Sequence, residues 1–283
     1  MIVIKLHLDL PPAMKNNFLF SILLISSLLV SCEKEKQLNI ENEGIDLISQ
    51  ILINGEVHQE YSYNELNLIS EEKSKFFYTR HSYNDNNQLT TSEFYLDPAM
   101  FSSSSSVIEA SMSRTEWVNP TNTTKSLTQE FEYDGENHLT RKKYIRPSVT
   151  DTEYSIFTYE NDMVVRQSMY WHSQVSTYTE YFYDPSGNLV KENRYRILEG
   201  SAPELITTLE YEFDKMKNPY LAFRRLLTPG KFTNQNNIIK ETYTIHFEVD
   251  SSIDKVQVRE TTYKYNDRGY PIRVGADTEY VYK

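Results

Sequence analysis

YFYDPSGNLVKE, residues 181–192, has the form of one complete β-hairpin. Its centre, residues 184–187, fits a type I turn followed by a left-handed residue. Asp suits the first position, Pro sets φ at the second, and Gly takes the last without a Cβ clash. A three-residue loop closed by such a glycine is a common connection between antiparallel strands. The stretch therefore predicts two short strands joined by this turn.

Weaker copies of this hairpin recur along the chain. Each has an aromatic strand end, then Asn, Asp or Glu, then three or four turn residues and usually an apolar residue. The spacing from the last aromatic residue to the leucine is identical in three copies, at residues 83–89, 133–139 and 183–189. The copies are YSYNELNL from Tyr61, HSYNDNNQL from His81, FEYDGENHL from Phe131, FTYENDMVV from Phe157, YFYDPSGNL from Tyr181, YEFDKMKNP from Tyr211 and YKYNDRGYP from Tyr263.

These copies predict an all-β protein. Asn54-Gly55, before the first copy, is a further strong hairpin signal, and no long stretch has a convincing helical period. Two strands per copy give about fourteen strands in an antiparallel meander. The irregular spacing does not fit the blades of a propeller. We expect a long curved sheet, single-layered or partly wrapped, and the spacing leaves open one continuous sheet or two abutting ones.

The chain contains 22 tyrosines, a residue type that suits the half-buried surface of a strand. In residues 177–183 neither face is cleanly apolar, because Thr, Glu and Tyr mix on both. Tyrosine covers its neighbours with a ring and keeps its hydroxyl in water, and cross-strand aromatic pairs contribute about 0.2 to 1 kcal/mol each. We therefore expect the tyrosines to hold the sheet together without a thick core.

YDPSGNLVKENRY, together with YKYNDRGYPIRV near the C-terminus and KNPY at residues 217–220, resembles the YD-repeat (Rhs-type) pattern. The chain is more closely similar to uncharacterised secreted lipoproteins of Gram-negative bacteria that carry degenerate copies of it. The resemblance covers most of residues 47–283, and the copy at Tyr181 is the nearest to the full motif. It implies long curved sheets, and it carries over no catalytic residue.

We interpret residues 1–31 as a signal peptide. We expect translation to start at Met14, so that residues 1–13 are not part of the protein made. Lys15 precedes an uncharged run, residues 18–31, which is short for a helix that spans a bilayer and suits a signal sequence. The run ends in Leu-Val-Ser before Cys32, the only cysteine of the chain, which resembles a bacterial lipobox. The resemblance implies cleavage before Cys32 and lipidation of its thiol. Residues 32–46 would then be the lipidated cysteine and a polar tether.

The net charge of −11 argues against nucleic acid as a partner, because phosphates require basic patches. It also argues against adhesion to anionic headgroups by charge, so the predicted membrane contact is the lipid on Cys32. We expect a cell-envelope location, in the outer membrane of a Gram-negative bacterium, with the periplasmic or surface side left open.

Two segments interrupt the single β-repeat domain predicted for residues 47–283. Residues 97–125 contain a serine run and Trp117, and residues 219–240 begin with a short helical turn and continue as an Asn-rich loop. Long insertions are often functional or mobile. The candidate ligand-binding residues are Tyr170, Trp171 and His172 at a strand end, and Trp117, since sugar rings stack on exposed aromatic faces. The alternative is that the tryptophans pack at the rim of the sheet.

No motif for catalysis, a metal or a cofactor is present: there is no HExxH, GxSxG, P-loop or GxGxxG. The acids Asp134, Asp184 and Asp214 follow strand aromatics and are better explained as turn formers than as catalytic pairs or Ca²⁺ ligands. We therefore expect no enzyme activity, no cofactor and no metal.

Three hypotheses for the function follow. The first is a lipid-anchored envelope protein whose sheet is a non-catalytic binding or scaffold surface for a glycan or another envelope protein. The second is a structural accessory subunit of an outer-membrane assembly. The third is a polysaccharide hydrolase, which would need two carboxylates about 5 to 9.5 Å apart in a cleft.

Overall fold

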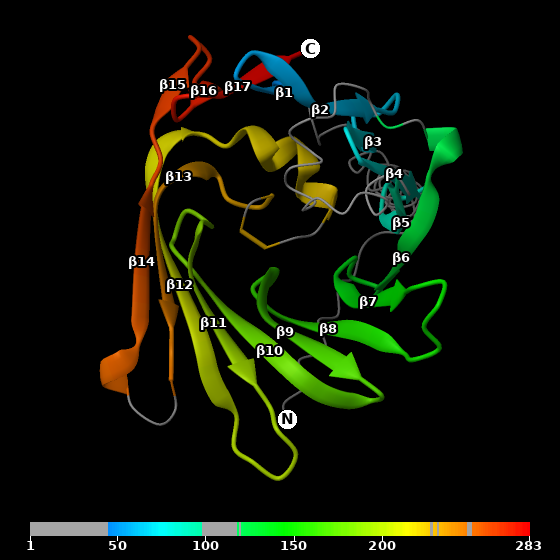
Figure 1. The fold of residues 1–283 in the computed structure, drawn as a ribbon, viewed down its shortest axis with the longest axis vertical. Coiled ribbons are helices and arrows are strands. Elements are labelled where there is room, and N and C mark those ends of the chain that lie inside the picture. The colour runs from blue at the N-terminus through cyan, green and yellow to red at the C-terminus, as the bar shows by residue number, and fades with distance from the viewer. Residues whose placement is uncertain (1–44, 98–117, 119, 227–228, 231, 248–250) are drawn as a thin grey trace, which may run out of the picture. The chain divides into compact units, whose positions relative to one another are not determined.

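The computed structural model describes residues 45–97, 118, 120–226, 229–230, 232–247 and 251–283 (Figure 1). The chain divides into two compact units, Met1–Glu43 and Gly44–Lys283, and the described residues all belong to the second. The predicted signal peptide, Cys32, most of the tether and Trp117 lie outside the described residues. Among the helices of the described ranges, none combines the length and the apolar character needed to cross a membrane.

The described part of the chain is nearly all β, as the sequence predicts, with seventeen strands and three 3-10 helices. The seven repeat hairpins supply fourteen of the strands, and β1, β14 and β17 are additional. The strands are β1 (Ile48–Ile53), β2 (Glu56–Tyr63), β3 (Ile69–Ser74), β4 (Phe77–Tyr83), β5 (Leu89–Leu96), β6 (Thr124–Tyr133), β7 (Leu139–Ile145), β8 (Glu153–Glu160), β9 (Met163–Trp171), β10 (Gln174–Tyr183), β11 (Leu189–Arg196), β12 (Glu204–Lys217), β13 (Asn236–Ile245), β14 (Lys255–Glu260), β15 (Tyr263–Tyr265), β16 (Pro271–Val274) and β17 (Thr278–Tyr282). The 3-10 helices are η2 (Pro120–Asn122), η3 (Pro219–Leu226) and η4 (Ser251–Ile253).

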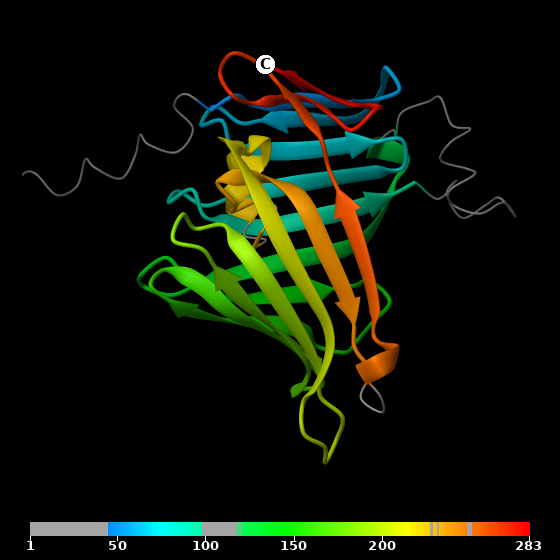
Figure 2. The same ribbon diagram turned by 90° about the vertical axis from the view of Figure 1, so that its left-hand side faces the viewer.

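The strands form one antiparallel meander. Each strand from β1 to β13 pairs with the next, β15 pairs with β16, β16 with β17, and β17 with β1. The sheet therefore wraps round an interior, but it is not closed into a barrel. Figure 2 shows β14 running beside β13 and leading on into β15.

Five hairpin turns share one hydrogen-bond pattern. In each, the side-chain oxygen of the first turn residue accepts bonds from the backbone N–H groups two and four positions later, at 2.8–3.0 Å. The fourth residue has a positive φ, which favours Asn and Gly. In the turn that begins at Asp184 this residue is Gly187, with φ 84°, as the sequence predicts. The first residues of the five turns are Asn64, Asn84, Asp134, Asp184 and Asn266.

The residue that follows each of these turns points into the interior. Each lies opposite the last strand tyrosine, beside a register shift, and is at most 2% exposed. In the first copy the residue opposite the last strand tyrosine is Ile69. It follows the leucine that ends the motif YSYNELNL. The spacing of six positions therefore holds in all five turns. The five residues are Ile69, Leu89, Leu139, Leu189 and Pro271.

A tyrosine hydroxyl ties each of four hairpins, and likewise the additional strand β17, to a preceding strand. The hydroxyl donates to the backbone carbonyl of the first or second residue of a preceding strand, at 2.5–2.9 Å. We call these bonds the tyrosine ladder. The expectation that the tyrosine hydroxyls stay in water is wrong for these residues, because a backbone carbonyl replaces the water. The pairs are Tyr63 and Ile48, Tyr83 and Ile69, Tyr133 and Leu89, Tyr183 and Val164, and Tyr282 and Pro271.

The helix η3 lies inside the curve of the sheet (Figure 1) and confirms the helical turn predicted after Asn218. Its Phe223 is 1% exposed and its ring lies 4.8 Å from that of Tyr61. Leu226 packs against both hydrophobic clusters, one built on β1–β3 and the other on β5–β8. A single short helix thus fills the space between two parts of one sheet.

We predict that Tyr133→Phe lowers the free energy of unfolding by about 1 kcal/mol, because the variant keeps the ring but loses a bond to a buried carbonyl. The hydroxyl of Tyr133 donates to the Leu89 carbonyl at 2.9 Å. Urea denaturation measures the change. Tyr170→Phe is the matched control, since the ring of Tyr170 stacks on Tyr154 at 4.8 Å and its hydroxyl bonds to none of the described residues. Equal effects of the two substitutions would contradict a stabilising role for the ladder.

The buried tyrosines, those of the ladder and Tyr159, also predict how the protein unfolds in alkali. Burial raises the pKa of Tyr159 to about 12, and it raises the pKa values of Tyr63, Tyr83, Tyr133 and Tyr183 as well. The folded pKa values exceed the unfolded value of about 10, so the neutral phenols contribute stability that is complete below pH 10 and is lost as the pH rises through the folded values. We expect tyrosinate absorbance to rise together with loss of the β-sheet circular dichroism. Ionisation of these tyrosines near pH 10 in a protein that stays folded would contradict this account.

Candidate functional site

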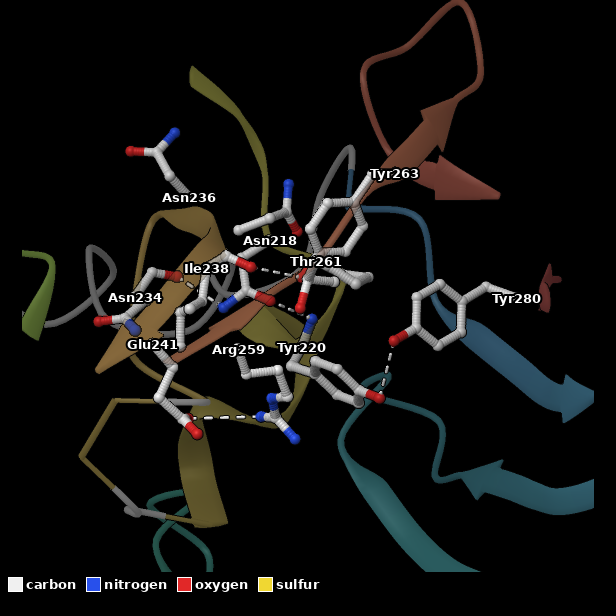
Figure 3. A pocket seen from close by; sticks show the side chains of 12 residues that line it. Asn218, Tyr220, Asn234, Asn236, Ile238, Glu241, Arg259, Thr261, Tyr263 and Tyr280 are labelled. Atoms are coloured by element: carbon white, nitrogen blue, oxygen red, sulfur yellow. Dashed lines mark hydrogen bonds and ion pairs between the residues drawn. The ribbon is translucent and has the colours of Figure 1, made fainter. Parts of the chain in front are cut away.

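A cavity of about 190 Å³ opens where β14 leads into β15 (Figure 3). The start of η3, the segment entering β13, the strands β13–β15 and β17 all contribute to its wall. The lining combines four asparagines, three tyrosines and two charged residues with Pro219, Ile238 and Thr261. We call it the asparagine pocket.

Three of the four asparagines are held by bonds from their amide nitrogens. Asn218 and Asn236 each donate to a backbone carbonyl, at 2.8 and 3.0 Å. Asn237 donates to the carboxylate of Asp214 at 3.1 Å. These side chains are fixed before any ligand arrives, which lowers the entropy that binding would cost.

Asn234 differs from the other three. Its side-chain oxygen accepts a bond from the backbone N–H of Leu189 at 2.7 Å, so the amide has a defined orientation. Its Nδ2 is buried and has no hydrogen-bond partner among the described residues, and the residue is 1% exposed. An unpaired buried donor costs about 1 to 3 kcal/mol.

The three tyrosines supply rings and neutral hydroxyls. The hydroxyls of Tyr220 and Tyr280 lie 3.1 Å apart, and their rings meet edge to face at 5.9 Å (Figure 3). Tyr263 donates to the carbonyl of Ile238 at 2.9 Å. Burial raises the pKa of Tyr263 to about 12 and raises those of Tyr220 and Tyr280. All three phenols therefore stay protonated at physiological pH.

The two charged residues of the lining neutralise each other. Glu241 of β13 lies directly opposite Arg259 of β14, and Nη2 of the arginine is 3.4 Å from Oε2 of the carboxylate. Figure 3 shows this contact at the edge of the pocket. The lining therefore carries no net charge.

The predicted aromatic site lies elsewhere, at the end of β9. Trp171 is 41% exposed, and its ring meets that of His172 edge to face at 5.3 Å. His172 also lies 2.6 Å from the carboxylate of Asp151, and Tyr170 stacks on Tyr154. The structure brings Trp171 and His172 into contact and leaves the tryptophan accessible, whereas Tyr170, as the preceding strand residue, faces the other side of the sheet. None of them lines the asparagine pocket.

Sequence reasoning also missed a polar array that is separate from the asparagine pocket. It is formed by Ser92, His81 and Glu72 on neighbouring strands. His81 Nδ1 lies 2.8 Å from Ser92 Oγ, and Nε2 lies 3.1 Å from Glu72 Oε1. The order resembles that of a serine nucleophile, its base and an orienting acid. Ser92 is only 2% exposed, however, so a substrate carbonyl has no access to its hydroxyl. The array links β3, β4 and β5 through buried hydrogen bonds.

The turn acids have structural partners. Asp134 and Asp184 each accept two backbone N–H bonds within their own turn, and Asp214 accepts bonds from Met216 and Asn237. Burial raises the pKa of Glu192, to which Tyr211 donates at 2.8 Å. The described ranges contain no group of three His, Cys, Asp or Glu side chains arranged to hold a metal ion.

The sequence does not predict the asparagine pocket, although the segment that contributes three of its asparagines stands out there as an Asn-rich loop. Asn234, Asn236 and Asn237 lie within five residues, TNQNN at 233–237. The available signal was this density of amides in a segment that interrupts the repeat. Their distant partners, such as Leu189 and Asp214, have no signature in the sequence.

No protein-family model matches the chain, and no curated protein matches it either. Among solved structures, a porin-like protein from Bacteroides uniformis has a TM-score of 0.39 and 10% identity, over 83% of this chain and 96% of the other. A porin-like protein from Bacteroides vulgatus has a TM-score of 0.38 and 8% identity, over 84% and 99%. The Tc holotoxin pore of Photorhabdus luminescens has a TM-score of 0.26 and 13% identity, over 79% of this chain and 12% of that chain. Likenesses of this strength assign no function.

Proposed function

We propose that this chain is a lipid-anchored cell-envelope protein that binds a glycan without catalysis, in the asparagine pocket. The observation that carries the proposal is a preorganised pocket lined by amides and neutral phenols, in which three of the amides are already held by hydrogen bonds. Amides and hydroxyls donate and accept hydrogen bonds, as sugar hydroxyls do.

The envelope location is supported by the sequence before the described residues. A basic Lys15, an uncharged run and Cys32 follow in the order of a lipoprotein signal. Two or three acyl chains would anchor the protein durably, since each buried methylene contributes about 0.8 kcal/mol. We place the anchor in the outer membrane of a Gram-negative bacterium, with YD-repeat-like hairpins forming the domain it carries.

The non-catalytic part of the proposal is supported by the charges in the pocket. Glu241 is the carboxylate of the lining, and Arg259 lies against it. Glycoside hydrolysis requires a pair of carboxylates with different roles. The exposed surface of Trp171, Tyr170 and His172 is a separate proposed contact for sugar rings, as is Trp117.

We predict that Thr261→Phe abolishes glycan binding, because Thr261 lines the pocket and a larger side chain there fills it. Glycan-array screening followed by calorimetry with the best ligand measures the effect. Thr242→Phe is the matched control. Thr242 follows Glu241 in β13 and faces the opposite side of the sheet, because successive strand residues alternate.

Trp171→Ala, tested with the same ligand, separates the two proposed surfaces. Binding that survives Trp171→Ala but not Thr261→Phe assigns the glycan to the pocket. The reverse result would move the site to the aromatic surface. An array on which the wild-type protein binds no glycan would overturn the proposed function.

We also predict that Cys32→Ala releases the protein from the membrane fraction, because the thiol that would carry the lipid is gone. Cell fractionation and metabolic labelling with a fatty acid measure the change. Retention of the variant in membranes would contradict a lipid anchor at Cys32. Protease treatment of intact and lysed cells then decides between the surface and the periplasmic side.

A further inference from the structure

We propose that the open edge of β14 pairs with the same edge of a second copy of this chain. Two sheets would then join through an antiparallel pair of β14 strands. The inference concerns the outside of the sheet and is independent of any ligand in the asparagine pocket.

One edge of β14 is occupied and the other is open. In the described ranges, β13 is the strand that pairs with β14, along its whole length and without a register shift (Figure 2). Just after β14, the N–H of Thr261 still donates to the carbonyl of Ile239 in β13, at 2.8 Å. The next residue, Thr262, uses the other edge, where its carbonyl accepts the N–H of Gly275 at 2.8 Å. The open edge of β14 therefore continues into the edge on which β16 already lies as an antiparallel strand.

The alternation of a strand identifies the backbone groups at the open edge. Successive residues direct their N–H and C=O groups to opposite edges of an antiparallel strand. Because Thr261 faces β13, the groups of Val256, Val258 and Glu260 point to the open edge. The described residues supply no partner for these groups. A row of unpaired backbone donors and acceptors is a template for another strand.

Exposed apolar side chains gather at the same edge. Val256 is 60% exposed, Val258 is 56% exposed, and Ile253 in η4 is 54% exposed, which makes them the three most exposed large hydrophobic residues of the described ranges. The two valines share the face of β14 opposite to Arg259. A strand paired with β14 would remove part of this apolar surface from water. Proline and register shifts often protect an edge strand, and β14 has neither.

The charges of β14 are arranged for pairing with itself. A two-fold axis normal to the sheet places residues of the same face opposite each other, so one residue must lie opposite its own copy. An axis at Gln257 would oppose Lys255 to Arg259 of the second copy, and an axis at Arg259 would oppose that residue to itself. Like charges directly opposite each other destabilise a strand pair.

An axis at Val258 avoids every such conflict. Val258 then lies opposite its own copy, and Val256 lies opposite Glu260 of the second copy. On the other face Gln257 lies opposite Arg259. All the backbone groups at the open edge are used in this register, which gives about six hydrogen bonds, two in each of three residue pairs. The chemistry of the edge therefore selects a second copy and fixes the register.

Cross-linking in membranes tests the register. We expect the full chain carrying Val258→Cys to form a disulfide-linked dimer on oxidation, because the two Cα atoms would lie about 5.5 Å apart, within the range of a disulfide. Val256→Cys is the matched control. It has the same face and similar exposure, but its own copy would lie about 13 Å away along the pair. The wild-type chain controls for cross-links through Cys32, its one cysteine.

Light scattering of the full chain in a mild detergent, over a series of concentrations, tests the association itself. We expect wild-type dimers, and we expect Val258→Lys to weaken them by at least about tenfold, because it opposes two like charges and removes an apolar contact. Leu198→Lys is the matched control. Leu198 is also an exposed hydrophobic residue, 51% exposed, but it lies beyond the end of β11, so its substitution should leave the dimer unchanged.

A wild-type chain that stays monomeric at every concentration would overturn the proposal. So would a dimer that Val258→Lys leaves intact, because its interface would lie elsewhere. Cross-linking through Val256→Cys in place of Val258→Cys would overturn the register. A cross-link from Val258→Cys to a different protein would assign the open edge to a strand of that protein and would exclude the second copy.

Discussion

The fold depends on one hydrogen bond that recurs, from the hydroxyl of a strand tyrosine to a backbone carbonyl in the preceding strand pair. Tyr83 makes it to Ile69 at 2.8 Å, and Tyr183 makes it to Val164 at the same distance. A hairpin alone is marginally stable. Pairing between adjacent strands satisfies the hydrogen bonds of the backbone groups but adds no link between one hairpin's side chains and the next. The ladder adds a bond between the interior face of one hairpin and the turn end of the one before. It makes neighbouring hairpins cooperative without a thick core.

The same bond explains why the sequence repeats in the way it does. The turn must place its sixth residue inward, opposite the tyrosine, and the side-chain oxygen of the first turn residue sets that geometry through two backbone bonds. Asn and Asp both supply this oxygen, so Asp184 and Asn84 are interchangeable in role. Gly or Asn at the fourth position accepts the positive φ. The copies share a local backbone geometry, so their amino-acid sequences can differ.

These local rules are the part that could be predicted from the sequence. The turn after Tyr183, the all-β meander and the helical turn after Asn218 depend on residues close together in the chain. The fate of the tyrosine hydroxyls could not be predicted, because the acceptor of Tyr133 lies 44 residues earlier. The asparagine pocket could not either, since Asn234 bonds to Leu189 across 45 residues. Long-range contacts of this kind leave no periodic signal.

The asparagine pocket lies where one bond of the tyrosine ladder is missing. The sixth copy, YEFDKMKNP, has Phe213 where the others have a tyrosine, so it has no hydroxyl to donate to the β11 turn end. The segment that follows replaces that link with amides, through Asn234 to Leu189 and Asn236 to Asn188. Amides have more donors than this link uses, and the surplus donor is the Nδ2 of Asn234. A regular repeat consumes its polar groups in holding itself together, and the break in this repeat is where amides and phenols gather round a cavity.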